Sequence, residues 1–382
     1  MKTVLISGAS IAGPALAYWL SRRGFAPTVV ERNPAPRPGG QAIDIRGSAL
    51  DVIDRMGLGD EIRAARTRMH GMTVFDRDGN ELERTTERTF TGGRFDSTDV
   101  EVMREDLSRI VVDATRDDVE YVYGDSIATL EEGEDAYGVQ VTFERGAPRT
   151  FDYVVGADGL HSTVRALAFG PEKPFLHQLG YQIAIFSADN YLDLNNWQIC
   201  VNDGDMPFSL IAYPVPDNSE LRITVGFKGD LPDYDYRDTE AHRALTAARI
   251  ADLRWESRRI LKSLDEADDF YFDTMAQVRM DHWSKGRVTL VGDAGYCPSP
   301  ITGQGTSLAL VGAYVLADSL AAAAATAAHG DGDGGHRAAY ARTETRMRPF
   351  IRLNQALAGR NAIDPATEAA RDHAKSAISL DG

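Results

Sequence analysis

The sequence VLISGASIAGP, residues 4–14, decides the fold of this chain. Its first three residues form an apolar run, as expected for a strand that is buried on both faces. A glycine-rich turn from Gly8 to Gly13 follows directly, and an apolar helical pattern then continues to Leu20. A second apolar run ends at Glu31. This order of strand, glycine turn, helix, strand and acid predicts a dinucleotide-binding βαβ unit.

Each position of this unit has a physical purpose. Gly8 allows the sharp turn, and Gly13 allows the helix to lie close to the strand. The helix N-terminus would direct its free N–H groups at a pyrophosphate. Glu31 lies near the spacing of roughly 20 residues at which an acid binds the ribose hydroxyls. Ser10 replaces the middle glycine of the usual pattern, and the motif alone does not distinguish NAD from FAD.

The composition argues against several classes of protein. The chain has 382 residues, enough for a large core, and a formal net charge of −16. This charge argues against binding to nucleic acid or to an anionic membrane surface. We find no apolar run near the roughly 20 residues of a membrane span, and the first run is too short for a signal peptide. Cys200 and Cys297 make no disulfide framework, so we expect a reducing cytoplasm. The scattered histidines indicate no metal site.

Two further strand ends carry acidic residues beside glycine. Asp158 and Gly159 follow one apolar strand, and Gly292 and Asp293 follow another. Open α/β sheets bind their ligands at the carboxyl ends of such strands. Standing alone, the Asp-Gly pair would be an ordinary turn.

A glycine-rich loop then opens a long helix. The run Thr302-Gly303-Gln304-Gly305 comes after Pro298 and precedes an apolar helical pattern that continues to Ala328. A helix N-terminus presents free N–H donors and the positive end of the helix dipole. The sequence therefore predicts donors for a bound group at this loop.

The remaining segments predict a sheet-rich region and further helices. We expect one strand over residues 121–130 and several strands between residues 175 and 275. A helical pattern covers Thr239 to Leu264, and a last helix covers residues 336–361. The tail after Pro365 is expected to be frayed or weakly packed.

The three motifs, taken in this order, resemble the single-component FAD-dependent monooxygenases of the para-hydroxybenzoate hydroxylase fold. The stretches around Asp44 and over residues 221–228 look most like the tetracycline-inactivating branch and its relatives in natural-product pathways. The resemblance implies an α/β fold in which a Rossmann-like FAD-binding domain carries an inserted β-sheet substrate domain and a C-terminal helix. It assigns residues 1–72, 98–175 and 276–328 to the FAD-binding domain, 73–97 and 176–275 to the substrate domain, and 336–361 to the C-terminal helix.

The resemblance also implies roles for the residues that match the family's motifs. Arg104 and Asp44 would contact the cofactor, and Asp293 would bind the ribityl chain. Asp158 and Gly159 match a motif associated with both FAD and nicotinamide nucleotides. The complete predicted cofactor-binding set is Gly8, Ser10, Ile11, Ala12, Gly13, Glu31, Arg32, Asp44, Arg46, Arg104, Asp158, Gly159, Gly292, Asp293 and Gly305.

The expected chemistry belongs to the flavin. Pro298, Gly303, Gln304 and Gly305 would lie beside its ring, where a helix N-terminus stabilises the negative charge of reduced flavin. We identify no residue that must act as a covalent nucleophile. The resemblance implies that NADPH or NADH binds transiently and reduces FAD. Oxygen from O2 would then reach an aromatic or polyketide-like small molecule through a flavin C4a-hydroperoxide.

The predicted substrate contacts and the predicted function each have alternatives. Ile211, Arg222 and Thr224 lie on predicted strands at positions comparable to pocket walls in relatives, and ordinary sheet packing is the alternative. We expect a monomer or a weak dimer. A reductase or oxidase on the same FAD fold shares every cofactor motif, and a non-enzymatic nucleotide-binding protein is a further alternative.

Overall fold

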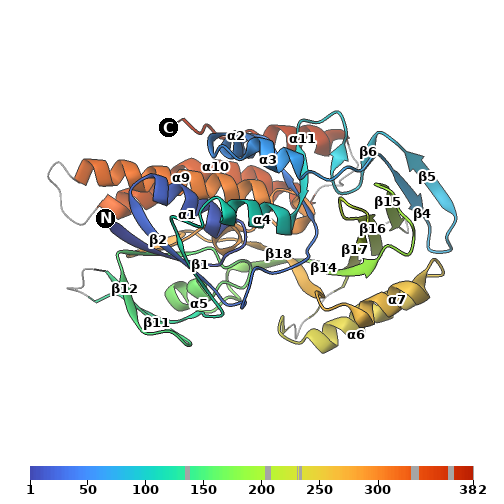
Figure 1. Ribbon diagram of the computed structural model, residues 1–382, viewed down its shortest axis with the longest axis horizontal. Helices are drawn as coiled ribbons and strands as arrows, with labels where there is room; N and C mark the ends of the chain where they lie inside the picture. Colours follow the sequence, from blue (N-terminus) through green and yellow to red (C-terminus); the bar gives the residue numbers. More distant parts are fainter. Residues whose placement is uncertain are drawn as a thin grey trace.

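Figure 1 shows two helix-covered sheets that lie side by side in a computed structural model of the chain. The structure describes residues 1–133, 138–202, 208–229, 231, 235–327, 335–359 and 365–381. The predicted helix ends at residues 328 and 361 lie outside the described residues. Two long helices, α9 (Gly305–Ala327) and α10 (Gly335–Gln355), pack against each other along the first sheet.

The first sheet contains the βαβ unit. Its strand order is β19-β20-β13-β1-β2-β9, and every pairing except β19 with β20 is parallel. The bounds are Lys2–Ser7 (β1), Phe25–Glu31 (β2), Glu120–Tyr123 (β9), Tyr153–Gly156 (β13), Ser284–Lys285 (β19) and Val288–Leu290 (β20). Val4, Leu5 and Ile6 are fully buried, and helix α1 (Ala12–Arg22) packs on β2 and on α9. Because β1, β13 and β20 are parallel, the three motifs that follow them meet at one edge.

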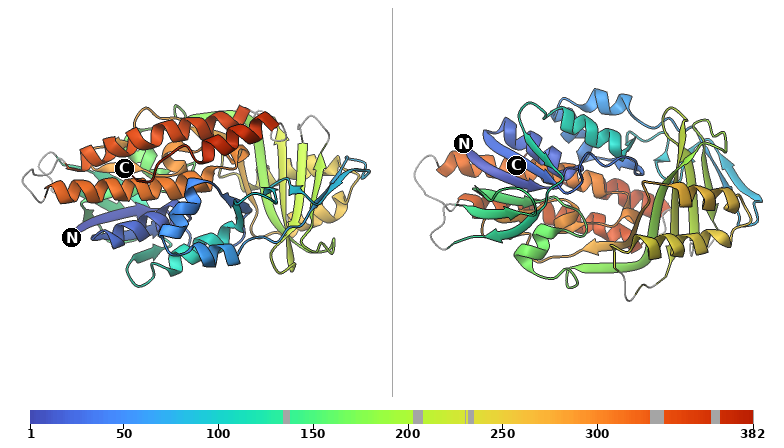
Figure 2. Two further views of the ribbon diagram at one scale, coloured as in Figure 1. Left: turned by 90° about the horizontal axis from the view of Figure 1, so that it is seen from above. Right: turned by 60° about the horizontal axis from the view of Figure 1, so that its bottom comes forward.

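The second sheet forms the other half of the molecule. Its strand order is β18-β14-β17-β16-β15-β4-β5. The bounds are Met72–Phe75 (β4), Glu81–Thr85 (β5), Leu176–Asp189 (β14), Gln198–Asn202 (β15), Phe208–Pro214 (β16), Glu220–Lys228 (β17) and Tyr271–Val278 (β18). One face is apolar and packs on α6 (Thr239–Ala251) and α7 (Ser257–Glu266), with Phe186 and Leu264 in its core. Strand side chains alternate, so the other face turns toward the first sheet (Figure 2).

Shorter elements complete the fold. Two small sheets pair β3 (Ala42–Ile45) with β8 (Val100–Met103) and β6 (Arg88–Thr89) with β7 (Gly93–Arg94). A third contains β10 (Ile127–Glu131), β11 (Val139–Phe143) and β12 (Arg149–Phe151). The remaining α-helices are α2 (Ser48–Arg55), α3 (Gly59–Ala64), α4 (Arg104–Asp113), α5 (Thr163–Phe169), α8 (Asp293–Tyr296) and α11 (Pro365–Lys375), and the 3₁₀ turns are η1 (Pro300–Thr302) and η2 (Ala356–Gly359).

Two predicted elements are each divided in the structure. The strand expected over residues 121–130 is two strands, because Gly124 has a φ of +76° and Asp125 accepts backbone N–H groups from Ser126, Arg145 and Gly146. The helical pattern from residue 239 to residue 264 is two helices, and Glu256 before the second has a left-handed φ of +48°. Local apolar spacing does not reveal either break.

The prediction of a frayed tail is wrong. Residues after Pro365 form helix α11, which packs against α10. Ala374 and Leu380 are almost fully buried. The tail is therefore part of the folded core.

Helix α9 has the length and composition of a membrane span, contrary to the expectation from the apolar runs. It is the one such helix among the described residues, over Gly305–Thr326, and 67% of its most apolar window is buried inside the protein. Helices in the centre of a globular core have the same composition. Its burial here is that of a core helix.

Candidate active site

In the first turn, between strand β1 and helix α1, the positions of Gly8 and Gly13 have no room for a side chain. Gly8 has a φ of +105°, and a Cβ there would lie 2.5 Å from the carbonyl oxygen of Ala157. A Cβ on Gly13 would lie 1.9 Å from the carbonyl oxygen of Gly8. Only glycine fits these two positions. The N-terminus of α1 therefore opens directly onto the space at the sheet edge.

The acidic residue after β2 lies beside this turn. Glu31 accepts hydrogen bonds from the backbone N–H groups of Ala9 and Asn33, each at 2.9 Å. A carboxylate has about four acceptor sites, so Glu31 retains capacity for ribose hydroxyls. The carbonyl of Ser10 accepts a hydrogen bond from Ser108 Oγ at 3.0 Å. Ser108, on α4, is a support of the turn that the sequence analysis missed.

The carboxylate of Asp158 is bound within the protein. It accepts hydrogen bonds from Ser162 Oγ at 2.5 Å, the Val164 N–H at 3.1 Å and Ser7 Oγ at 3.3 Å. Burial raises the pKa of Asp158, while these hydrogen bonds oppose that change. Asp158 thus holds the start of α5 against β1. Its role toward a nucleotide, and that of Gly159, stay predictions.

The third motif lies against the first. A Cβ on Gly292 would lie 3.1 Å from the Cβ of Ala12, so the end of β20 packs on the start of α1. Burial raises the pKa of the neighbouring Asp293. A Cβ on Gly305, at the start of α9, would lie 3.8 Å from Asp293 Oδ1. The structure therefore brings Asp293 and the glycine-rich loop together.

Three charged side chains carry buried atoms that lack a partner. Arg104 Nη2 donates to the carbonyls of Arg37 at 2.8 Å and Gly39 at 2.7 Å, and burial lowers the pKa of Arg104 to about 10. The Nε atoms of Arg104 and Arg46 and Oδ1 of Asp44 have no hydrogen-bond partner among the described residues. All three residues border the same cavity. Their free donors and acceptor fit a polar group bound there.

One cavity of about 1930 Å³ connects the motifs with the second sheet. The predicted residues that border it are Gly8, Ser10, Ile11, Ala12, Glu31, Arg32, Asp44, Arg46, Arg104, Asp158, Gly159, Asp293, Pro298, Gly303 and Gly305. Gly13 and Gly292 lie behind this lining, where they allow the close packing described above. The side chain of Gln304 is fully buried and also lies outside the lining.

The sequence matches known flavoproteins over nearly its whole length. A family described as an FAD binding domain matches residues 1–333. A flavin-dependent monooxygenase from an unknown prokaryotic organism is 39% identical and covers 93% of this chain and 88% of its own. This chain belongs to the FAD-dependent monooxygenases. An uncharacterised protein of Mycobacterium tuberculosis is 49% identical to it over 94% of each chain.

A solved structure agrees with this monooxygenase family. The crystal structure of the tetracycline destructase Tet(51) has a TM-score of 0.86 and 33% sequence identity, and the match covers 100% of both chains. The predicted fold class and the prediction of an FAD-dependent monooxygenase are thereby confirmed. The free buried atoms of Arg104, Arg46 and Asp44 fit FAD as the group in the cavity.

The monooxygenase presents one face of its second sheet to the cavity. Ile211 on β16 and Thr224 on β17 are register partners, and both border the cavity. The buried Oγ1 of Thr224 has no hydrogen-bond partner within the described part of the chain. These two predicted residues lie on the cavity side of the sheet, and their contact with a substrate stays a prediction.

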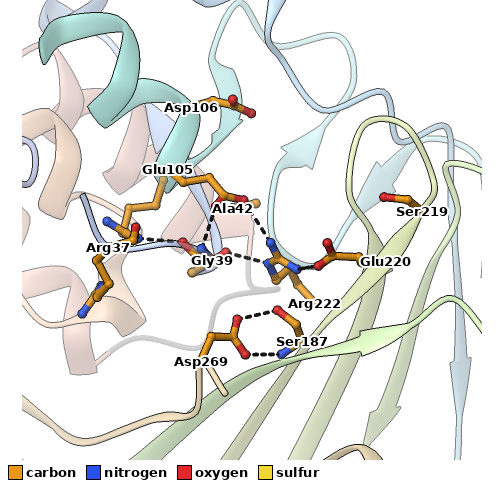
Figure 3. A network of polar contacts seen from close by, with 12 residues as sticks. Arg37, Gly39, Ala42, Glu105, Asp106, Ser187, Ser219, Glu220, Arg222 and Asp269 are labelled. Atoms are coloured by element: carbon orange, nitrogen blue, oxygen red, sulfur yellow. Dashed lines mark hydrogen bonds and ion pairs between the residues drawn. The ribbon is translucent and has the colours of Figure 1, made fainter. Parts of the chain in front are cut away.

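Arg222 does not border the cavity in the part of the enzyme that the structure describes. Its guanidinium donates to Glu105 at 2.9 Å, to Glu220 at 2.7 Å and to the carbonyl of Gly40 at 3.2 Å (Figure 3). Glu105 belongs to α4, and it also accepts the N–H of Gly39 at 2.6 Å. The structure places Arg222 in a link between the two halves of the enzyme, not in the substrate wall.

A charged cluster at the cavity edge is not predicted by the sequence motifs. His161 Nδ1 lies 2.9 Å from Glu172, and His161 Nε2 lies 3.2 Å from Asp273 on β18. The His161 ring stacks on Tyr236 with centroids 4.0 Å apart. Burial opposes protonation, but the hydrogen bonds to Asp273 and Glu172 outweigh it and raise the pKa of His161 to about 9. Its position three residues after Asp158 was the only available signal.

Proposed function

We propose that this enzyme is a single-component, NAD(P)H-consuming hydroxylase of an aromatic or polyketide-like small molecule. The observation that carries the proposal is the single cavity of about 1930 Å³, which extends from the glycine turn to the second sheet. Small-molecule sites usually measure roughly 300–1,000 Å³. This cavity therefore has room for a dinucleotide and a substrate together.

The residues around the cavity divide the task of holding FAD. The N-terminus of α1 would bind the pyrophosphate, and Glu31 the adenosine ribose. Arg104 and Asp293 would bind the flavin half, and the loop at Gly303 would face the flavin ring. When bound, the flavin would supply hydride acceptance and oxygen activation. The protein would bind and orient FAD and the substrate, and it would shield both from water.

The wall opposite this site supports a substrate that has both apolar surface and polar groups. Ile211 is apolar, and the buried hydroxyl of Thr224 supplies one free hydrogen-bonding atom. A similar structure carries the name tetracycline destructase, which supports a polycyclic, oxygen-rich ligand.

Both cysteines are free and buried, which supports a reducing compartment such as the cytoplasm.

The test is NADPH and NADH oxidation by the FAD-loaded enzyme across a panel of phenols and tetracyclines under ¹⁸O₂. We expect at least one compound to stimulate oxidation and to gain one ¹⁸O atom by mass spectrometry. Oxidation that yields only hydrogen peroxide with every compound would contradict the proposal and favour an oxidase. Oxidation coupled to reduction of the added compound would instead identify a reductase.

A matched variant locates the substrate. Thr224→Val removes the hydroxyl and keeps nearly the same volume, so we expect a higher KM and an unchanged Kd for FAD. An unchanged KM with the compound found in the panel would remove Thr224 from the substrate site.

A further inference from the structure

A chain of ion pairs joins the C-terminal helix α11 to the cofactor cavity. Lys375 Nζ lies 3.2 Å and 3.1 Å from the two carboxylate oxygens of Asp99. Asp99 Oδ2 lies 3.4 Å from Arg46 Nη1, and Arg46 Nη2 lies 2.8 Å from Asp44 Oδ2. The exposed fractions of the four side chains are 15% for Lys375, 5% for Asp99, 7% for Arg46 and 9% for Asp44. Three segments far apart in sequence thus share one buried charge network.

The charges in this network explain why it needs a cation from the tail. Arg46 lies between the buried carboxylates of Asp44 and Asp99. Glu101 and Arg371, which is on α11 like Lys375, add further charges beside Asp44. A buried charge without an opposite charge beside it costs free energy. The loss of one partner therefore leaves the remaining charge uncompensated and favours its movement. Lys375 supplies the positive charge from the tail that lies against Asp99. Its other partner, Asp372, lies on the same helix and is 61% exposed.

All four side chains of the network border the cofactor cavity, and two of them carry buried atoms without a hydrogen-bond partner among the described residues. Arg46 Nε and Asp44 Oδ1 are buried and lack a hydrogen-bond partner among the described residues, and both side chains border the cavity. A Cβ on Gly303 would lie 3.7 Å from Asp44 Oδ2 and 3.9 Å from Arg46 Nη2. The backbone N–H of Arg46 also donates to Ser307 Oγ on α9 at 3.0 Å. The pair therefore lies beside the glycine-rich loop.

The tail end of the network is fixed by packing. A Cβ on Gly47, the residue after Arg46, would lie 2.2 Å from the carbonyl oxygen of Lys375. Ser48 Oγ donates to the carbonyl of Ile378 at 3.3 Å, and Arg346 Nη2 donates to the carbonyl of Leu380 at 3.1 Å. Lys375 thus reaches Asp99 from a backbone that is itself held in place.

We propose that Lys375 is a positioning residue of the cofactor site, which acts through Asp99 to fix Arg46 and Asp44 toward bound FAD. The proposal rests on FAD as the cofactor and is independent of the substrate and of the electron donor. It makes the C-terminal helix a component of cofactor binding.

The test measures the Kd of the apoenzyme for FAD by quenching of flavin fluorescence. Loss of a charge-assisted contact is expected to weaken FAD binding about tenfold in Lys375→Gln and in Asp99→Asn. Lys375→Arg keeps the charge and should stay within about threefold of the original Kd. Because the two residues act in series, the double variant should bind FAD no more weakly than the worse single variant.

The control is Asp381→Asn, in the same tail. Asp381 pairs with Arg55 at 2.8 Å, but its side chain is 86% exposed and it lies outside the network. Its Kd for FAD should be unchanged. Far-UV circular dichroism establishes which variants fold, and if one of Lys375→Gln and Asp99→Asn does not fold, the other carries the test.

Three results would overturn the proposal. The first is a folded Lys375→Gln or Asp99→Asn enzyme with an unchanged Kd for FAD. The second is additive losses in the double variant, which would show that the two residues act separately. The third is an equal loss of FAD affinity in Asp381→Asn, which would show that the general stability of the tail controls FAD binding. None of these measurements depends on substrate turnover, so failure here leaves the proposed function untouched.

Discussion

At the scale of single residues, Gly13 and Ser10 lie in the same turn, but a side chain has different surroundings at the two positions. A Cβ at Gly13 collides with the carbonyl of Gly8. Ser10 borders the open cavity, and its contact with Ser108 is made through the backbone. The departure from the usual glycine pattern at Ser10 therefore leaves the turn intact, and its side chain faces the cofactor side.

Gly13→Ala is expected to destabilise the enzyme and to weaken FAD binding. The added methyl group forces β1 and α1 apart, and overpacking of this kind costs roughly 1–3 kcal/mol. Urea unfolding and titration with FAD measure the two effects. Ser10→Gly is the comparison, and we expect it to bind FAD at least as tightly as the original enzyme. Equal stability of Gly13→Ala would contradict the close approach seen here.

Glu101 gives a pH-dependent prediction at the same scale. Glu101 lies opposite Asp44 in the β3–β8 pair, and its Oε1 accepts a hydrogen bond from Thr67 at 2.6 Å. Burial, and then the charge of Asp44, raise the pKa of Glu101 to about 7 from its ordinary value of 4.5. The folded state therefore holds a proton that the unfolded state releases, and stability falls as pH rises from about 4.5 through about 7.

Glu101→Gln should remove this part of the pH dependence. Between pH 4.5 and 7 the original enzyme is expected to lose up to roughly 3 kcal/mol that the variant retains. Urea unfolding at several pH values measures how the free energy of unfolding of each protein changes with pH. Parallel curves for the two proteins over this range would show that Glu101 ionises normally in the folded state.

At the scale of elements, the apolar patterns located most strands and helices but not their breaks. The division between β9 and β10 depends on the Asp125 side chain, and the division between α6 and α7 depends on the backbone of Glu256. Hydrophobic spacing encodes neither side-chain hydrogen bonds to residues about 20 positions away nor a left-handed backbone angle. The tail helix α11 was missed for a different reason. Its order depends on packing against α10 and η2, which the apolar spacing of the tail alone does not reveal.

His161 connects two elements and is expected to stabilise them when protonated. The protonated ring bridges Glu172, near the end of α5, to Asp273 on β18. With a pKa raised to about 9, its contribution is fully present below about pH 6.5 and is lost as pH rises through 9. His161→Gln should therefore be less stable than the original enzyme at pH 7, by up to roughly 3 kcal/mol.

The measurement is thermal and urea unfolding of both proteins from pH 6 to pH 9.5. The stability difference should narrow as pH approaches 9 and beyond. A difference that stays constant across this range would mean that packing of the ring on Tyr236, and not its charge, holds the two elements together.

At the scale of the whole molecule, Arg222 links the second sheet to the cofactor half. Arg222→Met removes the ion pair with Glu105, which is 33% exposed and keeps its hydrogen bond from the Gly39 N–H. We therefore expect a loss of stability of roughly 1.5–3 kcal/mol. Glu220 pairs with the same guanidinium but is 50% exposed, so Glu220→Gln should change stability by less than about 1 kcal/mol. Urea unfolding compares the two variants. Equal losses of stability in the two variants would show that the ion pair between Arg222 and Glu105 on α4 is not the main contribution of Arg222.

The sequence by itself determined the cofactor half of this enzyme. The glycine turn, Glu31 and the two later strand ends are short motifs whose spacing is set by the backbone of one unit. Their chemistry can therefore be interpreted before any fold is known, and the comparisons confirm the FAD-dependent monooxygenase family that the motifs predict. The division into domains and the roles of single site residues remain proposals.

Only the tertiary structure decided which distant side chains meet. Arg222 lies on a predicted sheet strand, yet its partners are Glu105 and the carbonyl of Gly40. Lys375 reaches Asp99 across most of the chain length. Such contacts depend on how whole elements pack, and no local pattern records that packing. The glycine turn could be interpreted from eleven residues, whereas the network beside it required the complete fold.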